Sequence, residues 1–288
     1  MVLNRIRNIV SASLLLIAIG FATSAKASVD YTDIWYAAGG AESGWGVNMA
    51  HTNVTSTPST QDFIFATFFI YGPDGQPFWY AAELFRTSTT SEIFTGVMYR
   101  VKGTWFGAAT FPPVKAADVT VVGDATFTAT SSYAGTLRYR VDAVNVNKNI
   151  ERQTTTPLVV QDIYIGGIAG STSGNCGTTP ATFRNTSQFR LVQTAATQTA
   201  PGTLRIEFYG ADSTNVGVLI CFMQGNVTQH GKVLNVTGGN YQCSTGLNTS
   251  VEIDSVRLLD AGVEAHWRAN IGGVAGCTES GRLSGVKQ

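Results

Sequence analysis

Apolar and polar residues alternate in short stretches along most of the chain, and these stretches are rich in β-branched and aromatic residues. Because side chains on a strand point alternately to its two faces, this period is typical of strands with one buried face. Gly, Pro, Asn, Asp, Ser and Thr interrupt the stretches at intervals of roughly 10–15 residues, and no comparable stretch holds a helical period. The pattern predicts an all-β protein.

The clearest turn signal lies between two aromatic runs of the first half, at Tyr71-Gly72-Pro73-Asp74-Gly75-Gln76. Pro presets a turn and Asp-Gly tolerates a positive φ, so a hairpin is expected there. The strands predicted for this half are Trp45–His51, Phe63–Tyr71, Pro77–Phe85, Glu92–Lys102, Val119–Val122, Ala125–Thr130, Thr136–Val144 and Asn149–Gln153.

The run Gln153-Thr154-Thr155-Thr156-Pro157 breaks the pattern and separates a half without cysteine from a half with all the cysteines. It predicts two domains, residues 28–153 and 162–288, joined by a linker at 154–161. The strands predicted for the second domain are Asp162–Ala169, Ser187–Thr194, Thr203–Tyr209, Val216–Gln224, Lys232–Val236, Asn240–Cys243, Val251–Leu258, Val263–Ala269 and Gly281–Lys287.

Each half therefore offers about eight strands, which suffices for a small antiparallel barrel or a sandwich. We favour two consecutive barrels, because closure removes the edges that Thr-rich, weakly charged strands would expose. The glycine-containing runs Ile165–Ile168 and Gly281–Gly285 suit bent strands that pair as first and last members of a barrel. An integral outer-membrane barrel is the alternative, but it needs strands of about 9–11 residues, and several predicted strands are shorter.

The N-terminus has the features of a signal peptide. Arg5 and Arg7 precede the apolar run Ile9–Phe21, and Ala25-Lys26-Ala27 supplies small residues for cleavage after Ala27. A membrane anchor is the alternative interpretation, but a span needs about 20 apolar residues. We expect residues 1–27 to be removed and the protein to be secreted or periplasmic, soluble and not membrane-spanning.

Charge narrows the possible partners. The chain has 19 basic and 19 acidic residues, and three of the basic ones lie in the predicted signal peptide, which leaves 16 against 19. A mildly acidic chain lacks the basic excess that nucleic-acid binding requires. We therefore expect no nucleic-acid partner.

The four cysteines, even in number and in an exported chain, predict disulfides. Cys221 and Cys243 flank the turn signal His230-Gly231-Lys232 symmetrically, so a hairpin would place them opposite each other. We favour Cys221–Cys243, with Cys176–Cys277 by elimination. No C-x-x-C or short histidine repeat is present, so no metal or other cofactor is expected.

Two segments resemble known catalytic or phosphate-binding motifs, but the spacing of their residues does not match either motif. In Gly40-Ala41-Glu42-Ser43-Gly44 the serine stands one position too late for a nucleophile elbow. In Gly225–Val233 five residues separate the glycines where a phosphate loop needs four, and Val follows Lys where Ser or Thr is needed.

Acidic and histidine residues give weak catalytic signals. A glycosidase needs two facing carboxylates, and the candidates Glu42, Glu83 and Glu92 have no spacing that pairs them. His51 and His266 stand singly, as strand-surface or satisfied buried histidines do. A carboxylate-dependent hydrolase using Glu42 remains an alternative.

One local signature is specific: Ala41–Asn48, which reads A-E-S-G-W-G-V-N, then Phe63–Tyr71, then Asp74-Gly75 and Pro77–Tyr80. This order resembles an uncharacterised module of secreted and cell-surface proteobacterial proteins, with Phe68 where Trp is commoner. The second half resembles a companion module in Cys221…Gly225, Gly238–Cys243 and Gly281–Val286. The resemblance implies export but no established activity.

The aromatic residues of the first half allow two interpretations. In one, aromatics and charged residues gather at a barrel opening and bind a glycan or a small apolar ligand; this candidate site is Glu42, Trp45, Trp79, Tyr80, Trp105 and Arg152. In the other, the aromatics fill the barrel and Glu42 is a buried acid paired with Arg138, Arg140 or Arg152. We predict a non-enzymatic protein that binds a ligand or an envelope protein, with a structural envelope component as a further alternative.

Overall fold

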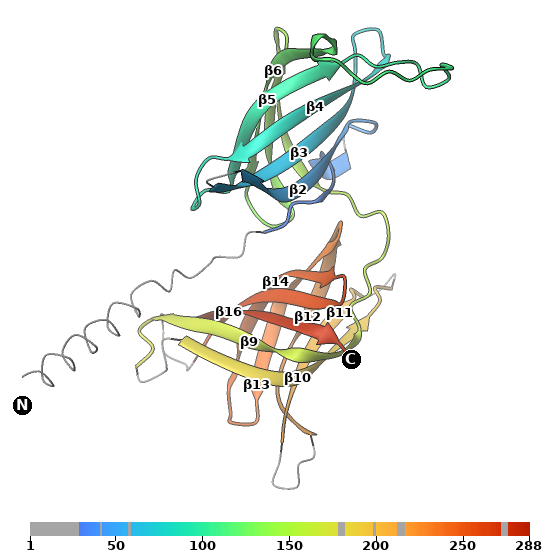
Figure 1. The fold of residues 1–288 in the computed structure, drawn as a ribbon. Helices are drawn as coiled ribbons and strands as arrows, with labels where there is room; N and C mark the ends of the chain where they lie inside the picture. The colour runs from blue at the N-terminus through green and yellow to red at the C-terminus, as the bar shows by residue number, and fades with distance from the viewer. Residues whose placement is uncertain are drawn as a thin grey trace, which may run out of the picture. The chain divides into compact units, whose positions relative to one another are not determined.

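The computed structural model describes residues 29–40, 42–56, 59–177, 182–197, 200–211, 217–271 and 276–288. In this part of the chain, sixteen strands form two closed antiparallel barrels of eight strands each, which confirms the fold predicted from the alternation (Figure 1). The predicted signal peptide lies outside the described residues.

In the first barrel each strand pairs with the next strand in the sequence. The barrel closes where β1 pairs with β8, and Trp35 lies opposite Arg152 in this pair. Alternate residues point inward, and Trp35, Phe68, Phe94 and Phe127 are fully buried. Its strands are β1 (Asp33–Ala37), β2 (Gly46–Ser56), β3 (Ser59–Tyr71), β4 (Pro77–Arg86), β5 (Ile93–Val101), β6 (Val119–Ala129), β7 (Ala134–Val141) and β8 (Val144–Arg152), with short 3-10 turns at Ala38–Gly40 and Ala116–Asp118.

The second barrel closes by pairing its first and last strands. Gly281 of β16 lies opposite Gly170 of β9, and a Cβ at Gly281 would lie 2.3 Å from a ring carbon of Trp267, so only glycine fits there. The strands are β9 (Asp162–Gly174), β10 (Thr182–Thr194), β11 (Thr203–Ala211), β12 (Gly217–His230), β13 (Val233–Cys243), β14 (Asn248–Leu259), β15 (Gly262–Asn270) and β16 (Cys277–Lys287).

Several predicted strand limits are wrong in instructive ways. The expectation omitted β1 and divided β6 at Gly123–Asp124, so the total of eight was reached with two compensating errors. Gly123 is not a break, because it lies against Arg140 of β7, where a Cβ would be 1.8 Å from the Arg140 carbonyl oxygen. Likewise, the predicted strands 232–236 and 240–243 are one continuous strand, β13.

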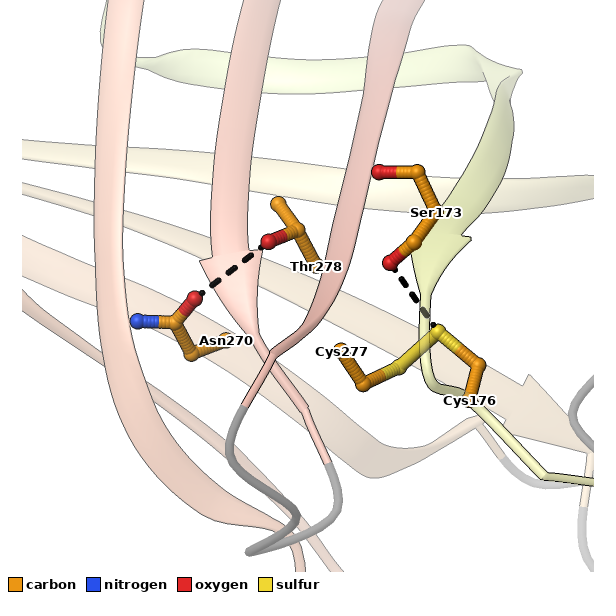
Figure 2. Close-up of a disulfide and its surroundings, with 5 residues drawn as sticks. All are labelled: Ser173, Cys176, Asn270, Cys277 and Thr278. Carbon is orange, nitrogen blue, oxygen red and sulfur yellow. Dashed lines mark hydrogen bonds between the residues drawn. A yellow bond between two sulfur atoms is a disulfide. The ribbon is translucent and has the colours of Figure 1, made fainter.

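Both predicted disulfides are present. Cys221 and Cys243 are cross-strand partners in the hairpin that turns at Gly231, whose φ is 57°. Cys176, just beyond β9, is bonded to Cys277 at the start of β16, and its Sγ lies 3.2 Å from the carbonyl oxygen of Ser173 (Figure 2). Both bridges therefore lie at the end of the second barrel where β9 ends and β16 begins.

Candidate functional site

The first barrel has a cavity at one end. The connections β1–β2, β3–β4, β5–β6 and β7–β8 all lie at this end, which we call the open end (Figure 1). The cavity has a volume of about 770 Å³, within the range of small-molecule sites. Its lining consists of Glu42, Ser43, Trp45, Ile70, Tyr71, Gly72, Pro73, Phe78, Tyr80, Arg100, Tyr139, Val141, Asp142, Val144, Val146 and Lys148.

Aromatic side chains form one wall and the floor of this cavity. The Trp45 indole N–H donates a hydrogen bond of 2.9 Å to the Tyr139 hydroxyl, and the two rings stack at 20° with centroids 6.3 Å apart. Phe68, fully buried, packs beneath Tyr139 with ring centroids 5.3 Å apart. Burial raises the pKa of Tyr139, so this hydroxyl stays neutral well above physiological pH.

Two ion pairs hold the charged groups of the lining. Lys148 pairs with Glu42, and its Nζ also lies 5.1 Å from the centre of the Trp45 ring. Arg100 pairs with Asp142 at 2.9 Å, with its guanidinium 5.6 Å from the centre of the Tyr80 ring. Because each cation already has both an acid and an aromatic neighbour, the lining is polar at its rim without a free net charge.

Local backbone features place these groups. Asp142 has a positive φ of 50° in the two-residue turn between β7 and β8, a conformation that Asp tolerates better than most residues. Gly44, with φ 94°, lets the connection before Trp45 approach Tyr71, whose ring would lie 3.2 Å from a Cβ at this position. The turn closes with a hydrogen bond from the Trp45 N–H to the Glu42 carbonyl oxygen.

The structure brings together three of the six predicted site residues: Glu42, Trp45 and Tyr80. Glu42 has a half-exposed side chain and pairs with Lys148, so the alternative of a buried acid paired with Arg138, Arg140 or Arg152 is wrong.

The other three predicted residues lie elsewhere. Trp79 follows the inward Phe78 on β4 and therefore points to the exterior, where it is 53% exposed. Trp105 lies on the β5–β6 connection and is 68% exposed. Arg152 is buried at the opposite end of the barrel, where it pairs with Asp33 at 3.1 Å, so it cannot orient a ligand at the open end.

The other acidic candidates are also apart from the cavity. Glu83 faces outward on β4, opposite Phe65. Glu92 lies at the end opposite the cavity, where it binds Arg86 at 3.0 Å and accepts a hydrogen bond from Tyr31. Neither carboxylate can face Glu42 across a substrate.

His51 lies near Tyr31, Arg86 and Glu92 in a polar cluster at the end of the barrel opposite the cavity. Its Nδ1 accepts a hydrogen bond of 3.1 Å from the Tyr31 backbone N–H, and its Nε2 lies 2.5 Å from Asp62. With both ring nitrogens engaged inside the barrel, His51 is a satisfied buried histidine.

Sequence reasoning missed Tyr139, Lys148, Arg100 and Asp142. Lys148 could have been predicted from the alternation of side chains along β8, because it shares the inward face of this strand with Val144, Val146 and Ile150. An inward lysine near a strand end indicates a polar opening. Arg100 and Asp142 had no comparable signal, because their proximity depends on the register of β5 against β6 and of β6 against β7.

The second barrel is packed with side chains instead. Trp267, Phe189 and Tyr241 are buried in its core. Glu279 projects among them and accepts a hydrogen bond of 3.1 Å from the Trp267 indole, and burial raises the pKa of this carboxyl. Among the described residues, no three His, Cys, Asp or Glu side chains are placed to hold a metal ion.

Comparisons with known proteins yield little. No family model matches the chain, and no curated protein matches it. One solved structure, described as a "putative outer membrane protein" from Bacteroides fragilis NCTC 9343, is similar at 12% identity and a TM-score of 0.29, over 85% of this chain and 98% of that chain. This likeness is too slight to bear on function. Within the described residues, no helix is long and apolar enough to cross a membrane.

Proposed function

We propose that this is an exported, non-enzymatic binding protein that takes a small, mainly apolar ligand into the cavity at the open end of its first barrel. The observation that carries the proposal is a cavity of about 770 Å³ whose deeper lining is aromatic and aliphatic and whose charges lie in pairs. Such a lining favours an apolar body with a modest polar end over a strongly charged ligand.

A glycan is the less favoured ligand. Sugars stack on an aromatic face that is free to receive them. The Trp45 ring already has Tyr139 stacked beside it and Lys148 over it. The aliphatic residues Val144 and Val146 on β8 add surface that an apolar ligand would cover and a sugar would not.

Export is supported by two features of independent origin. The predicted signal peptide opens the chain, and the four cysteines form two disulfides, which persist in oxidising compartments. A secreted or periplasmic location follows from this proposal.

A titration with N-phenyl-1-naphthylamine, a small apolar fluorophore, tests the proposal. Val146→Trp would fill the cavity from β8, and Asn147→Trp adds the same side chain one residue along, on the exterior. We expect the wild type and Asn147→Trp to bind the probe. Val146→Trp should bind at least about tenfold more weakly, because its indole occupies volume in which the probe would bury apolar surface, and losing about 1.4 kcal/mol of that burial is a factor of ten.

Circular dichroism of both variants confirms that the fold is kept. Trp45→Ala provides a second route to weaker binding if Val146→Trp folds poorly. Equal binding by all four proteins, or none by the wild type, would refute the proposal and favour a structural envelope component.

A hydrolase is the second candidate, and a specific observation keeps it open: Glu42 and Asp142 line the same cavity. Each carboxylate is engaged by its own cation, whereas a glycosidase needs one of its two acids protonated. Turnover of a panel of aryl glycosides and esters that is lost in both Glu42→Gln and Asp142→Asn, with the fold intact, would establish this activity.

A further inference from the structure

The connection between β5 and β6, residues 102–118, presents large apolar side chains to solvent. Trp105, Phe106 and Phe111 are 68%, 89% and 67% exposed. The loop leaves the barrel at the open end (Figure 1), and its base is fixed by a hydrogen bond of 2.8 Å from the Lys102 N–H to the Asp118 carbonyl oxygen. Apart from the 3-10 turn at Ala116–Asp118 the loop has no regular structure, and connections of this length are uncommon in compact domains and usually carry a function.

The exterior of β3 and β4, the two strands that precede β5 in the barrel, also carries exposed apolar side chains. Phe69 of β3 lies directly opposite Trp79 of β4, and both are more than half exposed. Phe65 lies on the same outward face of β3 and is 43% exposed; the carboxylate of Glu83 on β4 lies opposite it and marks the margin of the apolar surface away from the open end. Together they define an apolar collar on one side of the open end: Phe65, Phe69, Trp79, Trp105, Phe106 and Phe111.

The opposite side of the same barrel has a different exterior. The outward residues of β7 include Arg138 and Arg140, and those of β8 include Asn145, Asn147 and Asn149. The exterior of the barrel is therefore amphipathic, and an exposed apolar area confined to one side marks an interaction surface.

The charged residues of the loop indicate which kind of partner this surface binds. The loop carries Lys102 and Lys115, both exposed, and no acidic residue lies between positions 103 and 117. The carboxylate of Asp118 accepts the Lys115 backbone N–H at 2.9 Å and is thereby turned back onto the loop. A basic loop is complementary to an anionic surface.

From these observations we infer that the apolar collar docks on an anionic lipid bilayer. Exposed Trp and Phe beside Lys is the composition of segments that lie in the interfacial region of a membrane. Docking in this way places the cavity opening at the lipid surface, where apolar ligands are found. The docking surface is independent of whether the cavity holds a ligand.

Binding to vesicles tests this inference. Protein recovered after export is mixed with vesicles of phosphatidylcholine alone or of equimolar phosphatidylcholine and phosphatidylglycerol, and partitioning is measured by co-sedimentation. We expect the triple variant Trp105→Ser, Phe106→Ser, Phe111→Ser to bind mixed vesicles at least about tenfold more weakly than the wild type. The control Ile165→Ser, Val286→Ser removes an exposed apolar pair from the second barrel and should bind like the wild type.

Substitutions of Lys102 and Lys115 measure the electrostatic contribution to vesicle binding. Lys102→Gln and Lys115→Gln should each weaken binding to the anionic vesicles by about fivefold and leave the weaker binding to phosphatidylcholine unchanged. The collar variants should still bind N-phenyl-1-naphthylamine in solution, which keeps this test separate from that of the cavity.

Three outcomes would overturn the inference: no vesicle binding by the wild type, equal binding by the triple variant, or equal loss in the control. A self-association of the wild type in sedimentation velocity that the triple variant abolishes, without vesicle binding, would assign the collar to a protein contact instead.

Discussion

Removing the two disulfides separately should destabilise the second barrel by different amounts. The Cys176–Cys277 bridge closes a loop with a sequence separation of 101 residues, whereas Cys221–Cys243 closes one of 22. In the chain-entropy account, a disulfide stabilises by restricting the unfolded chain, and the effect grows with the logarithm of the loop length. The longer loop should therefore contribute more.

The expected magnitudes follow from these separations. Chain entropy gives about 4.7 kcal/mol for the longer loop and about 3.4 kcal/mol for the shorter one at 25 °C. The variant Cys176→Ser, Cys277→Ser should thus lose about 1.3 kcal/mol more than Cys221→Ser, Cys243→Ser. Removing both cysteines of a pair avoids a free thiol that could form a wrong bridge.

Native-state hydrogen exchange followed by mass spectrometry measures these losses locally. Peptides from β9 to β16 report the free energy of opening of the second barrel, and peptides from β2 to β7 serve as an internal comparison, because the first half of the chain contains no cysteine. A larger loss for the Cys221–Cys243 pair, or losses below about 1 kcal/mol for both pairs, would refute the entropic reasoning.

Three further predictions concern buried groups. Arg152→Ala should lower the free energy of unfolding by about 3–5 kcal/mol in a urea titration, because Asp33 would keep a buried, unpaired charge, and ligand binding should not depend on Arg152 directly. Glu279→Gln should stabilise the protein at pH 7, as measured by urea titration. Burial raises the pKa of this carboxyl in the folded protein, so Glu279 favours folding only at low pH, and this contribution is lost as the pH rises through the folded pKa. The gain in stability from Glu279→Gln should therefore vanish below about pH 4, where the carboxyl is protonated in both states. Gly281→Ala should lower the thermal midpoint, since its Cβ would overlap Trp267, and an unchanged midpoint would contradict the close packing of β16 against this ring.

The fold was largely accessible from the sequence because barrel strands alternate strongly. The hairpin at residues 72–76 and the pairing of Cys221 with Cys243 both followed from turn chemistry. The strand Asp33–Ala37 was not predicted, because it is only five residues long and its inward face begins with a charged residue, the buried Asp33.

The candidate site was accessible only in part, because aromatic residue type does not reveal direction. Trp79 and Tyr80 are adjacent, so one must face outward if the other faces inward, and parity alone could have separated them. Arg152 is the last residue of β8, so the end of the barrel at which it lies depends on how many strands separate it from Trp45. Dividing β6 into two strands reverses the expected direction of β8 and so brings Arg152 to the wrong end.

The most direct test of the central claim uses the five tryptophans as reporters. In protein labelled with 5-fluorotryptophan, fluorine NMR gives one signal each for Trp35 in the core, Trp45 in the cavity, Trp79 on the exterior, Trp105 on the loop and Trp267 in the second barrel. Titration with N-phenyl-1-naphthylamine should shift the Trp45 signal while those of Trp79, Trp105 and Trp267 stay in place. A shift confined to Trp79 or Trp267, with Trp45 unchanged, would contradict a ligand site at the open end of the first barrel.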